Sequence, residues 1–224
     1  LSGYSIGVEL RGTGDTTITS SEITVTNAAL IASGSGTLSI DDSEINGGKS
    51  LGEFSQISTE FTNTNFVGGE NTETGFSWTG GSHVLTDVNV SRTYIGASDT
   101  YSEGFYAWWA DVTVNNVWLS GWRNFVHCER CVVDGNQIGM DNGGANNGNG
   151  ISVIDGDFVV SNVETAHMTT AANLEGFSTI VVESWEGEMH NTLVVVSEDS
   201  LAQIRHISTS DMTGTIAYGD GEMH

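Results

Sequence analysis

A six-residue pattern recurs along the chain: an apolar residue, four mostly polar residues and a second apolar residue. Its first two copies run from Ile18 to Ile23 and from Ile40 to Ile45. The copies begin at Ile18, Ile40, Phe61, Leu85, Val114, Val133, Val160 and Ile207, with a poorer match near Val182. Most copies start roughly 20 to 29 residues after the previous one, and self-similarity at such a period is typical of solenoids.

The residues around each copy indicate short strands joined by polar corners. Thr16 to Ile18, Leu38 to Ile40 and Val112 to Val114 alternate between apolar and polar positions, as a strand with one buried face does. The residues between the two apolar positions are rich in Asn, Asp, Ser and Gly, which favour tight turns. The pattern therefore predicts an all-β fold, a right-handed parallel β-helix of about nine coils with three short strands each.

A second strand lies upstream of each corner, and we align it over residues 75–78, 104–107, 124–127 and 150–153. The alignment predicts that Phe105 and Ala107 point inward and that Tyr106 and Trp108 point outward. It also places His127 in the inward column. A β-sandwich would show hairpin turns, and a leucine-rich repeat would show a regular Leu frame; neither is present.

The coil length, the three strands and the polar corner resemble the pectin-lyase-like right-handed β-helix superfamily over nearly the whole chain. The resemblance implies one β-helix domain spanning residues 1–224. It leaves function open, because that superfamily includes polysaccharide lyases, hydrolases, phage tail spikes and adhesins. The Asn-Thr-Asp, Gly-His-Gly and Arg-Ile-Lys strings expected of its polygalacturonase-type hydrolases do not occur here.

Charge narrows the choice of partner. The chain has 29 acidic residues against 6 Lys and Arg, for a formal net charge of −23. Such a surface repels nucleic acid and anionic membranes, so neither is expected as a partner. A soluble surface is one interpretation; the other is adaptation to high salt, where the acidic, lysine-poor composition resembles proteins of halophilic archaea and their viruses.

The two ends suggest a piece of a longer chain. Gly187-Glu188-Met189-His190 returns as Gly221-Glu222-Met223-His224, as if another coil began there. No run of 18 apolar residues is present, so we expect no membrane insertion.

Aromatic residues cluster between positions 101 and 122, in Tyr101, Phe105, Tyr106, Trp108, Trp109, Trp118 and Trp122. Outward Trp and Tyr offer flat faces suited to stacking on sugar rings. We therefore expect a ligand surface formed by Tyr106, Trp108, Trp109, Trp118, Trp122 and Arg123, walled by a loop near residues 96–103. Packing beneath that loop, or against a second subunit, is the alternative.

Candidate catalytic and metal-binding residues are fewer. Glu129 and Asp155 occupy matching positions of adjacent coils in our alignment, and two carboxylates at such spacing could cleave a glycosidic bond. Asp141 and Asn142 open a polar loop whose oxygens could hold Ca²⁺, although a plain surface loop is favoured. No cofactor is firmly implied by the sequence, and Ca²⁺ is the one candidate.

Cys128 and Cys131 flank Glu129-Arg130. Two buried thiols are the favoured interpretation, because a zinc site would need a second pair of ligands. A disulfide would need a turn between the two residues.

Together these features favour an extracellular or virion-surface β-helix, of the tail-spike or adhesin type, that recognises a cell-surface polysaccharide or glycoprotein. The alternatives are a polysaccharide lyase or glycoside hydrolase, and a structural spacer. The resemblance to tail spikes also implies that copies of the chain could form a trimer.

Overall fold

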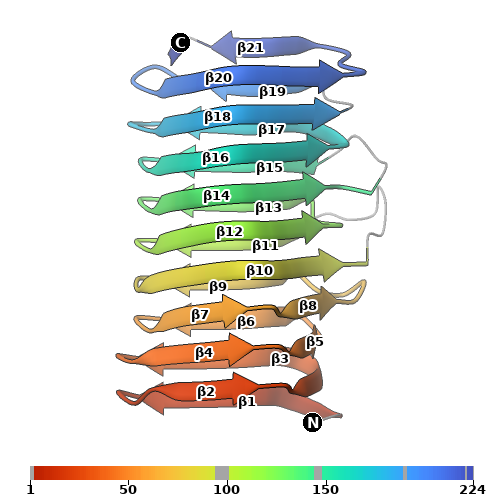
Figure 1. The fold of residues 1–224 in the computed structure, drawn as a ribbon, viewed down its shortest axis with the longest axis vertical. Helices are drawn as coiled ribbons and strands as arrows, with labels where there is room; N and C mark the ends of the chain where they lie inside the picture. Colours follow the sequence, from red (N-terminus) through yellow and green to blue (C-terminus); the bar gives the residue numbers. More distant parts are fainter. Residues whose placement is uncertain (1–2, 94–100, 144–147, 189–190, 220, 224) are drawn as a thin grey trace.

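The computed structural model describes residues 3–93, 101–143, 148–188, 191–219 and 221–223. These residues form an all-β, parallel β-helix of about nine coils, stacked along one axis with the termini at opposite ends (Figure 1). The front strands run from left to right as the chain climbs, which is the sense of a right-handed coil (Figure 1). The described residues include no helix, and thus none able to cross a membrane.

Two ladders of parallel strands make up the wall of the solenoid. Ladder A consists of β1 (Tyr4–Gly12), β3 (Glu22–Gly34), β6 (Ser50–Ser55), β9 (Thr74–Thr79), β11 (Glu103–Trp108), β13 (Asn124–Glu129), β15 (Gly148–Ile154), β17 (Met168–Glu175), β19 (Thr192–Val196) and β21 (Thr215–Gly219). Each pairs with the next by parallel hydrogen bonding, as in β11 with β13.

Ladder B forms the opposite side. It consists of β2 (Thr16–Thr19), β4 (Thr37–Asp41), β5 (Glu44–Gly47), β7 (Ser58–Thr62), β8 (Asn65–Gly68), β10 (Ser82–Arg92), β12 (Asp111–Ser120), β14 (Val132–Asp141), β16 (Asp157–Ala166), β18 (Thr179–Glu188), β20 (Leu201–Ser210) and β22 (Glu222–Met223). The start of β3 pairs with β5 in ladder B and its later part pairs with β6 in ladder A. Early coils thus hold three strands, whereas from β10 onward the second and third strands run continuously through the corner.

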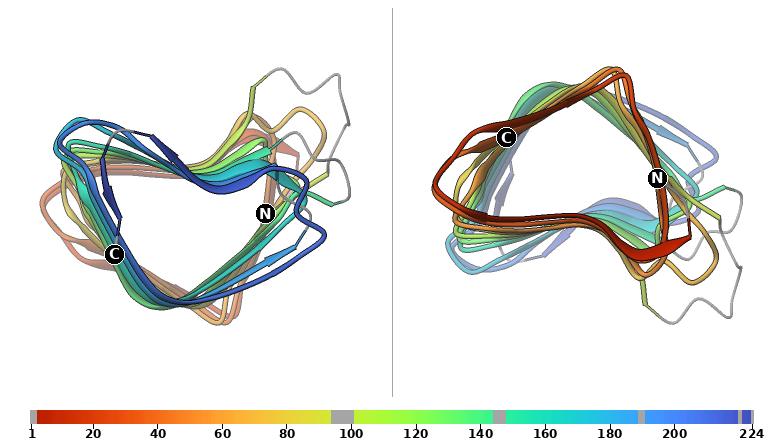
Figure 2. Two further views of the ribbon diagram at one scale, coloured as in Figure 1. Left: turned by 90° about the horizontal axis from the view of Figure 1, so that it is seen from above. Right: turned by 90° about the horizontal axis from the view of Figure 1, so that it is seen from below.

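The interior is a stack of apolar columns. Phe54, Trp78, Ala107, Cys128 and Val153 occupy one column of ladder A, and all five are buried. Aromatic rings fill the early coils, where Phe66 and Phe76 meet edge to face with their centroids 4.7 Å apart. The alternation of buried and exposed positions predicted from sequence is therefore confirmed, and the coils enclose one continuous core (Figure 2).

The predicted corners are confirmed in the first coils. Ser20, Asp42, Asn63, Asp87 and Asn116 all have positive φ between 47° and 56°, the left-handed region that short polar side chains tolerate. Each lies inside one of the six-residue copies.

Two copies of the pattern were assigned in the wrong register. Val114 pairs with Gly135 rather than Val133, because the coil turns two residues later than the apolar pattern predicts. Gly135 is required there: its φ is 141° and a Cβ would overlap the backbone of Val114. Ile207 pairs with Trp185, and Ile204 takes the predicted corner position instead.

The upstream strand was misaligned by one residue in β13 alone, while residues 75–78, 104–107 and 150–153 align in the structure as predicted. Asn124 pairs with Glu103, so Cys128 enters the inward column and His127 faces outward beside Tyr106. Phe125 and Val126 are both buried, so the sequence of β13 does not show which of its alternating positions face inward.

Candidate ligand-binding groove

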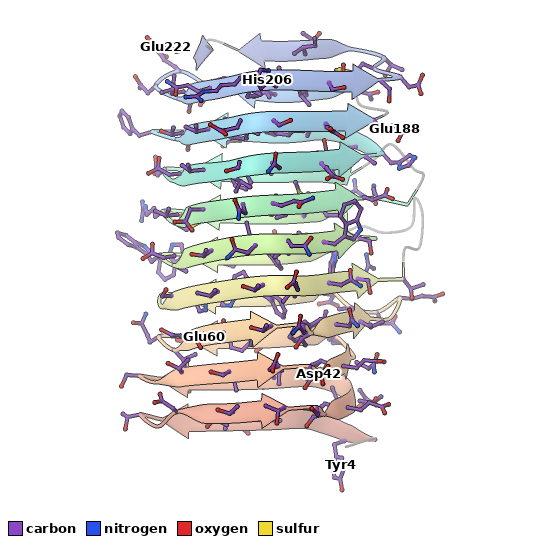
Figure 3. All side chains as sticks on the ribbon, viewed as in Figure 1. Tyr4, Asp42, Glu60, Glu188, His206 and Glu222 are labelled. Carbon is purple, nitrogen blue, oxygen red and sulfur yellow. A yellow bond between two sulfur atoms is a disulfide. The ribbon has the colours of Figure 1, made fainter. Side chains whose placement is uncertain are left out.

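A hollow of about 400 Å³ lies on the outer surface of ladder B, beyond the corner and toward the ends of the strands. Five consecutive strands, β12, β14, β16, β18 and β20, contribute to it. Figure 3 labels Glu188 at this end of β18. The lining residues are Trp118, Met140, Asp141, Glu164, Thr165, Ala166, His167, Glu186, Gly187, Glu188, Ser208, Thr209 and Ser210. We call this hollow the Trp118 groove; its volume falls in the usual range of small-ligand pockets.

Trp118 forms one end of the groove and is held there by a glycine. It pairs with Gly139 in the next coil, and a Cβ at Gly139 would overlap the six-membered ring of Trp118. The indole therefore lies across the glycine backbone, with 41% of the residue exposed. Packing against Gly139 fixes the ring, so a ligand would lose little side-chain entropy on stacking against it.

Acidic side chains continue the same outward column. Gly139 pairs with Glu164, and Glu164 pairs with Glu186 one coil further on. Neighbouring coils of a sheet lie about 4.8 Å apart. Gln137 Nε2 donates a hydrogen bond of 3.0 Å to Glu164 Oε1, which orients this carboxylate. These oxygens can accept hydrogen bonds from hydroxyl or amine groups.

An aspartate–histidine pair lies on the adjacent column. Asp141 Oδ1 and His167 Nδ1 are 2.8 Å apart, and Asp141 Oδ1 also accepts a bond from the backbone N–H of Gly143. The backbone N–H of His167 donates to the carbonyl of Glu188. With Asp141 accepting, Nδ1 carries the proton and Nε2 is the free end of the ring. The imidazole is thus held at the rim of the groove.

The floor beneath these residues is rigid. Trp185 is fully buried, and its Nε1–H donates a 2.8 Å bond to Oγ1 of the buried Thr165. A floor that satisfies its own polar atoms leaves the side chains above it available to a ligand.

Four of the five aromatic residues predicted to form one surface lie at three separate places. Trp118 lies in the groove. Trp108 is the last residue of β11 and Trp109 lies in the turn that follows this strand, with their ring centroids 6.4 Å apart. Tyr106 is outward, as predicted, and packs edge to face on His127 at 5.2 Å. Burial raises the pKa of its hydroxyl, helped by the charges of Glu129 and Glu103.

Trp122 was wrongly assigned to the ligand surface. It is fully buried, its Nε1–H donates a 3.0 Å bond to the carbonyl of Val90, and Arg92 lies 5.9 Å above its ring. Arg123 is partly buried, and its backbone N–H bonds to Ser102 Oγ. The predicted wall over residues 96–103 falls largely outside the described residues.

The predicted alignment of Glu129 with Asp155 is wrong. Glu129 pairs with Ile154, and Asp155 follows Ile154 in the turn after β15. Asp155 Oδ2 lies 3.9 Å from Arg130 Nε, and its Oδ1 accepts a bond from the backbone N–H of Phe177. This carboxylate therefore has partners within the fold.

Cys128 and Cys131 form a disulfide, which replaces the two thiols favoured from sequence. Arg130 supplies the turn between them, with φ at 51°, and the Cα atoms come to 5.5 Å. Such a distance suits a disulfide, whereas an extended strand would hold the two cysteines too far apart.

Asp141 and Asn142, the predicted calcium ligands, are separated by their surroundings. Asp141 bonds His167, while Asn142 is fully buried. Within the part of the chain that the structure describes, no three His, Cys, Asp or Glu side chains come together as metal ligands. Residues 144–147 of this loop lie outside the described residues.

Sequence reasoning found Trp118 and Asp141 but missed Glu164, His167, Glu186 and Glu188. Glu164 and Glu186 carried a signal, since they are 22 residues apart and hold the same position of consecutive coils. Comparison with protein-family models, with curated proteins and with solved structures gives no match to this chain.

Proposed function

We propose that this chain is a surface β-helix that recognises glycans, and that the Trp118 groove is its binding site. The observation that carries the proposal is an exposed indole, fixed against Gly139, in a hollow lined by carboxylates, hydroxyls and an oriented imidazole. A flat apolar face beside hydrogen-bonding groups matches a sugar, which has an apolar ring face and hydroxyls around its edge.

A panel of oligosaccharides tests the proposal, with binding measured by calorimetry or by tryptophan fluorescence. We expect Trp118→Ala to abolish detectable binding of the best ligand while the fold is retained. Trp109→Ala is the matched control, because Trp109 is more exposed but lies at the turn after β11. Binding that survives Trp118→Ala unchanged would remove the groove from the proposal.

A location outside the cytoplasm is part of the same proposal. The Cys128–Cys131 disulfide supports it, because structural disulfides persist mainly in oxidising compartments. The net charge of −23 supports a high-salt habitat, such as that of a halophilic archaeon or its virus. In that case the unfolding temperature should rise steeply between low and molar KCl.

Glycoside hydrolysis is the second candidate, favoured by the adjacent placement of Glu164 and Glu186. Release of reducing ends from a bound oligosaccharide, lost in Glu164→Gln, would establish it. A tail-spike role would further predict trimers, which light scattering measures. A plain spacer would bind no glycan at all.

A further inference from the structure

The charges around the Trp118 groove restrict which glycan it can accept. This step rests on the proposed function. Four carboxylates line the groove, from Asp141, Glu164, Glu186 and Glu188, and His167 is the only basic side chain among the lining residues. A uronate or sulfated sugar would meet repulsion from all four, in a chain that is already strongly negative.

The arginine on the groove strands forms an ion pair outside the groove. Arg205 lies on β20, which also lines the groove, but its Nη1 bonds Glu183 Oε1 at 3.0 Å. Neither residue lines the groove. The carboxylates of the groove are thus not neutralised by an arginine from the same strands.

Trp118 favours a cation for a separate reason. The face of an indole attracts an ammonium group through its quadrupole, more strongly than other aromatic side chains do. The carboxylates of Glu164 and Glu186 continue the column in which the indole stands. A ring stacked on Trp118 would therefore extend its substituents toward negatively charged oxygens.

We infer that the groove binds saccharides that carry protonated amines, namely amino sugars without N-acetyl groups, in preference to neutral or anionic ones. The sugar ring stacks on Trp118, and its ammonium groups donate hydrogen bonds to Glu164 and Glu186. An N-acetyl group removes the charge, and a carboxylate reverses it.

Three hexamers of equal length test the inference on the whole chain by calorimetry: β-1,4-linked glucosamine, β-1,4-linked N-acetylglucosamine and α-1,4-linked galacturonate. The buffer is kept at a pH that protonates the amines and at physiological salt. We expect the glucosamine hexamer to bind about tenfold more tightly than the N-acetylated one, a factor within reach of one cation–π contact and two charged hydrogen bonds. The galacturonate hexamer should show no binding.

The matched control separates a local site from the general charge of the chain. Glu22 and Glu44 pair with each other in the same outward column, several coils before Trp118, and both are exposed. The double variant Glu164→Gln with Glu186→Gln should weaken binding of the glucosamine hexamer severalfold. The double variant Glu22→Gln with Glu44→Gln should leave binding within about twofold, because the effect of exposed charges several coils away is weak and screened by salt.

Each other outcome is decisive. Equal losses from the two double variants would show a diffuse charge effect and overturn the inference. If the N-acetylated hexamer bound as well, and Trp118→Ala abolished that binding, the inference would fall while glycan recognition stood. If none of the hexamers bound and the wider panel of oligosaccharides also failed, both proposals would fall.

Discussion

The Trp118 groove and the turn that carries Trp109 both contain a tryptophan and acidic residues. At the turn these side chains contact an arginine that lies between them, whereas in the groove they line an open hollow. At the turn, three consecutive coils place Trp109, Arg130 and Asp155 at the same left-handed position, with φ between 51° and 54°. The Arg130 guanidinium lies 5.6 Å from the Trp109 ring centroid, and its Nε lies 3.9 Å from Asp155 Oδ2. In the groove, Trp118 meets a glycine, and the acids that follow meet the open hollow.

The difference shows how stacking decides the role of a column. In a solenoid each outward residue has the residue one coil away as its neighbour. In a column of an aromatic, a cation and an acid, the cation therefore contacts both the ring and the carboxylate. In a column of an aromatic, a glycine and an acid, the glycine supports the ring but leaves its outer face uncovered. The ring and the acid then remain open to a ligand. Exposed tryptophan alone therefore does not identify a binding site; its neighbours in the stack do.

The largest expected effect separates the buried Trp122 from Trp118, the residue that we propose binds the glycan. Trp122→Ala should cost about 3–5 kcal/mol of unfolding free energy, because it empties a buried site and removes the indole hydrogen bond to the Val90 carbonyl. Trp118→Ala should cost about 1 kcal/mol or less, since 41% of that residue is already exposed. Denaturant unfolding of both variants measures the difference; equal costs would mean that Trp118 is a packing residue.

The buried side chain of His83 should make the stability of the fold depend on pH, and variants of the groove and of the turn are best compared above the pH at which this loss begins. His83 is fully buried, accepts a bond from Thr59 Oγ1 at Nδ1 and donates to the Gly80 carbonyl at Nε2. Burial lowers its pKa from 6.5 to about 4. Because the unfolded chain binds the proton first, stability should fall as the pH drops from 6.5 to 4, by about 3 kcal/mol in all.

His83→Gln provides the control for this titration. The variant lacks the imidazole, so its stability should lose this part of the pH dependence while the carboxylates titrate as before. Thermal unfolding across the pH range, or an NMR titration of the ring, measures it. A ring that titrates near pH 6.5 in the folded protein would contradict the burial argument.

Most of the fold could be predicted from sequence because a solenoid repeats its pattern locally. The corner positions at Ile18, Ile40, Phe61, Leu85, Val114 and Val160 align in the structure as expected. Even the error at Val133 kept every side chain on the correct face, because it was a slip of two residues and strands alternate with a period of two.

The candidate site was harder because it depends on register between coils. A slip of one residue in β13 exchanged the faces of His127 and Cys128 and aligned Glu129 with the wrong partner. The groove residues lie on five strands, and only correct stacking brings them together. Proximity along the chain, which grouped Trp118 with Trp108 and Trp122, did not indicate proximity in space.

Gly139→Ala tests the orientation of Trp118 without removing any side chain that lines the groove. The added Cβ would overlap the Trp118 ring and turn the indole away from the glycine. We expect glycan affinity to fall about tenfold, which corresponds to losing one well-placed aromatic contact. Stability should change less than for Trp122→Ala, because the exposed ring can rotate. Unchanged affinity would show that the orientation of Trp118 does not matter for binding.

Arg130→Ala should have the smallest effect and act only at the turn. It removes a guanidinium from the Trp109 ring and from Asp155, both of them partly exposed, so we expect a loss of at most about 1 kcal/mol of unfolding free energy. High salt should shrink the ion-pair part of that loss. Glycan affinity should stay the same, because Arg130 does not line the groove. A loss of affinity in Arg130→Ala, measured beside Trp118→Ala, would mean that Trp109, Arg130 and Asp155 also belong to the binding site.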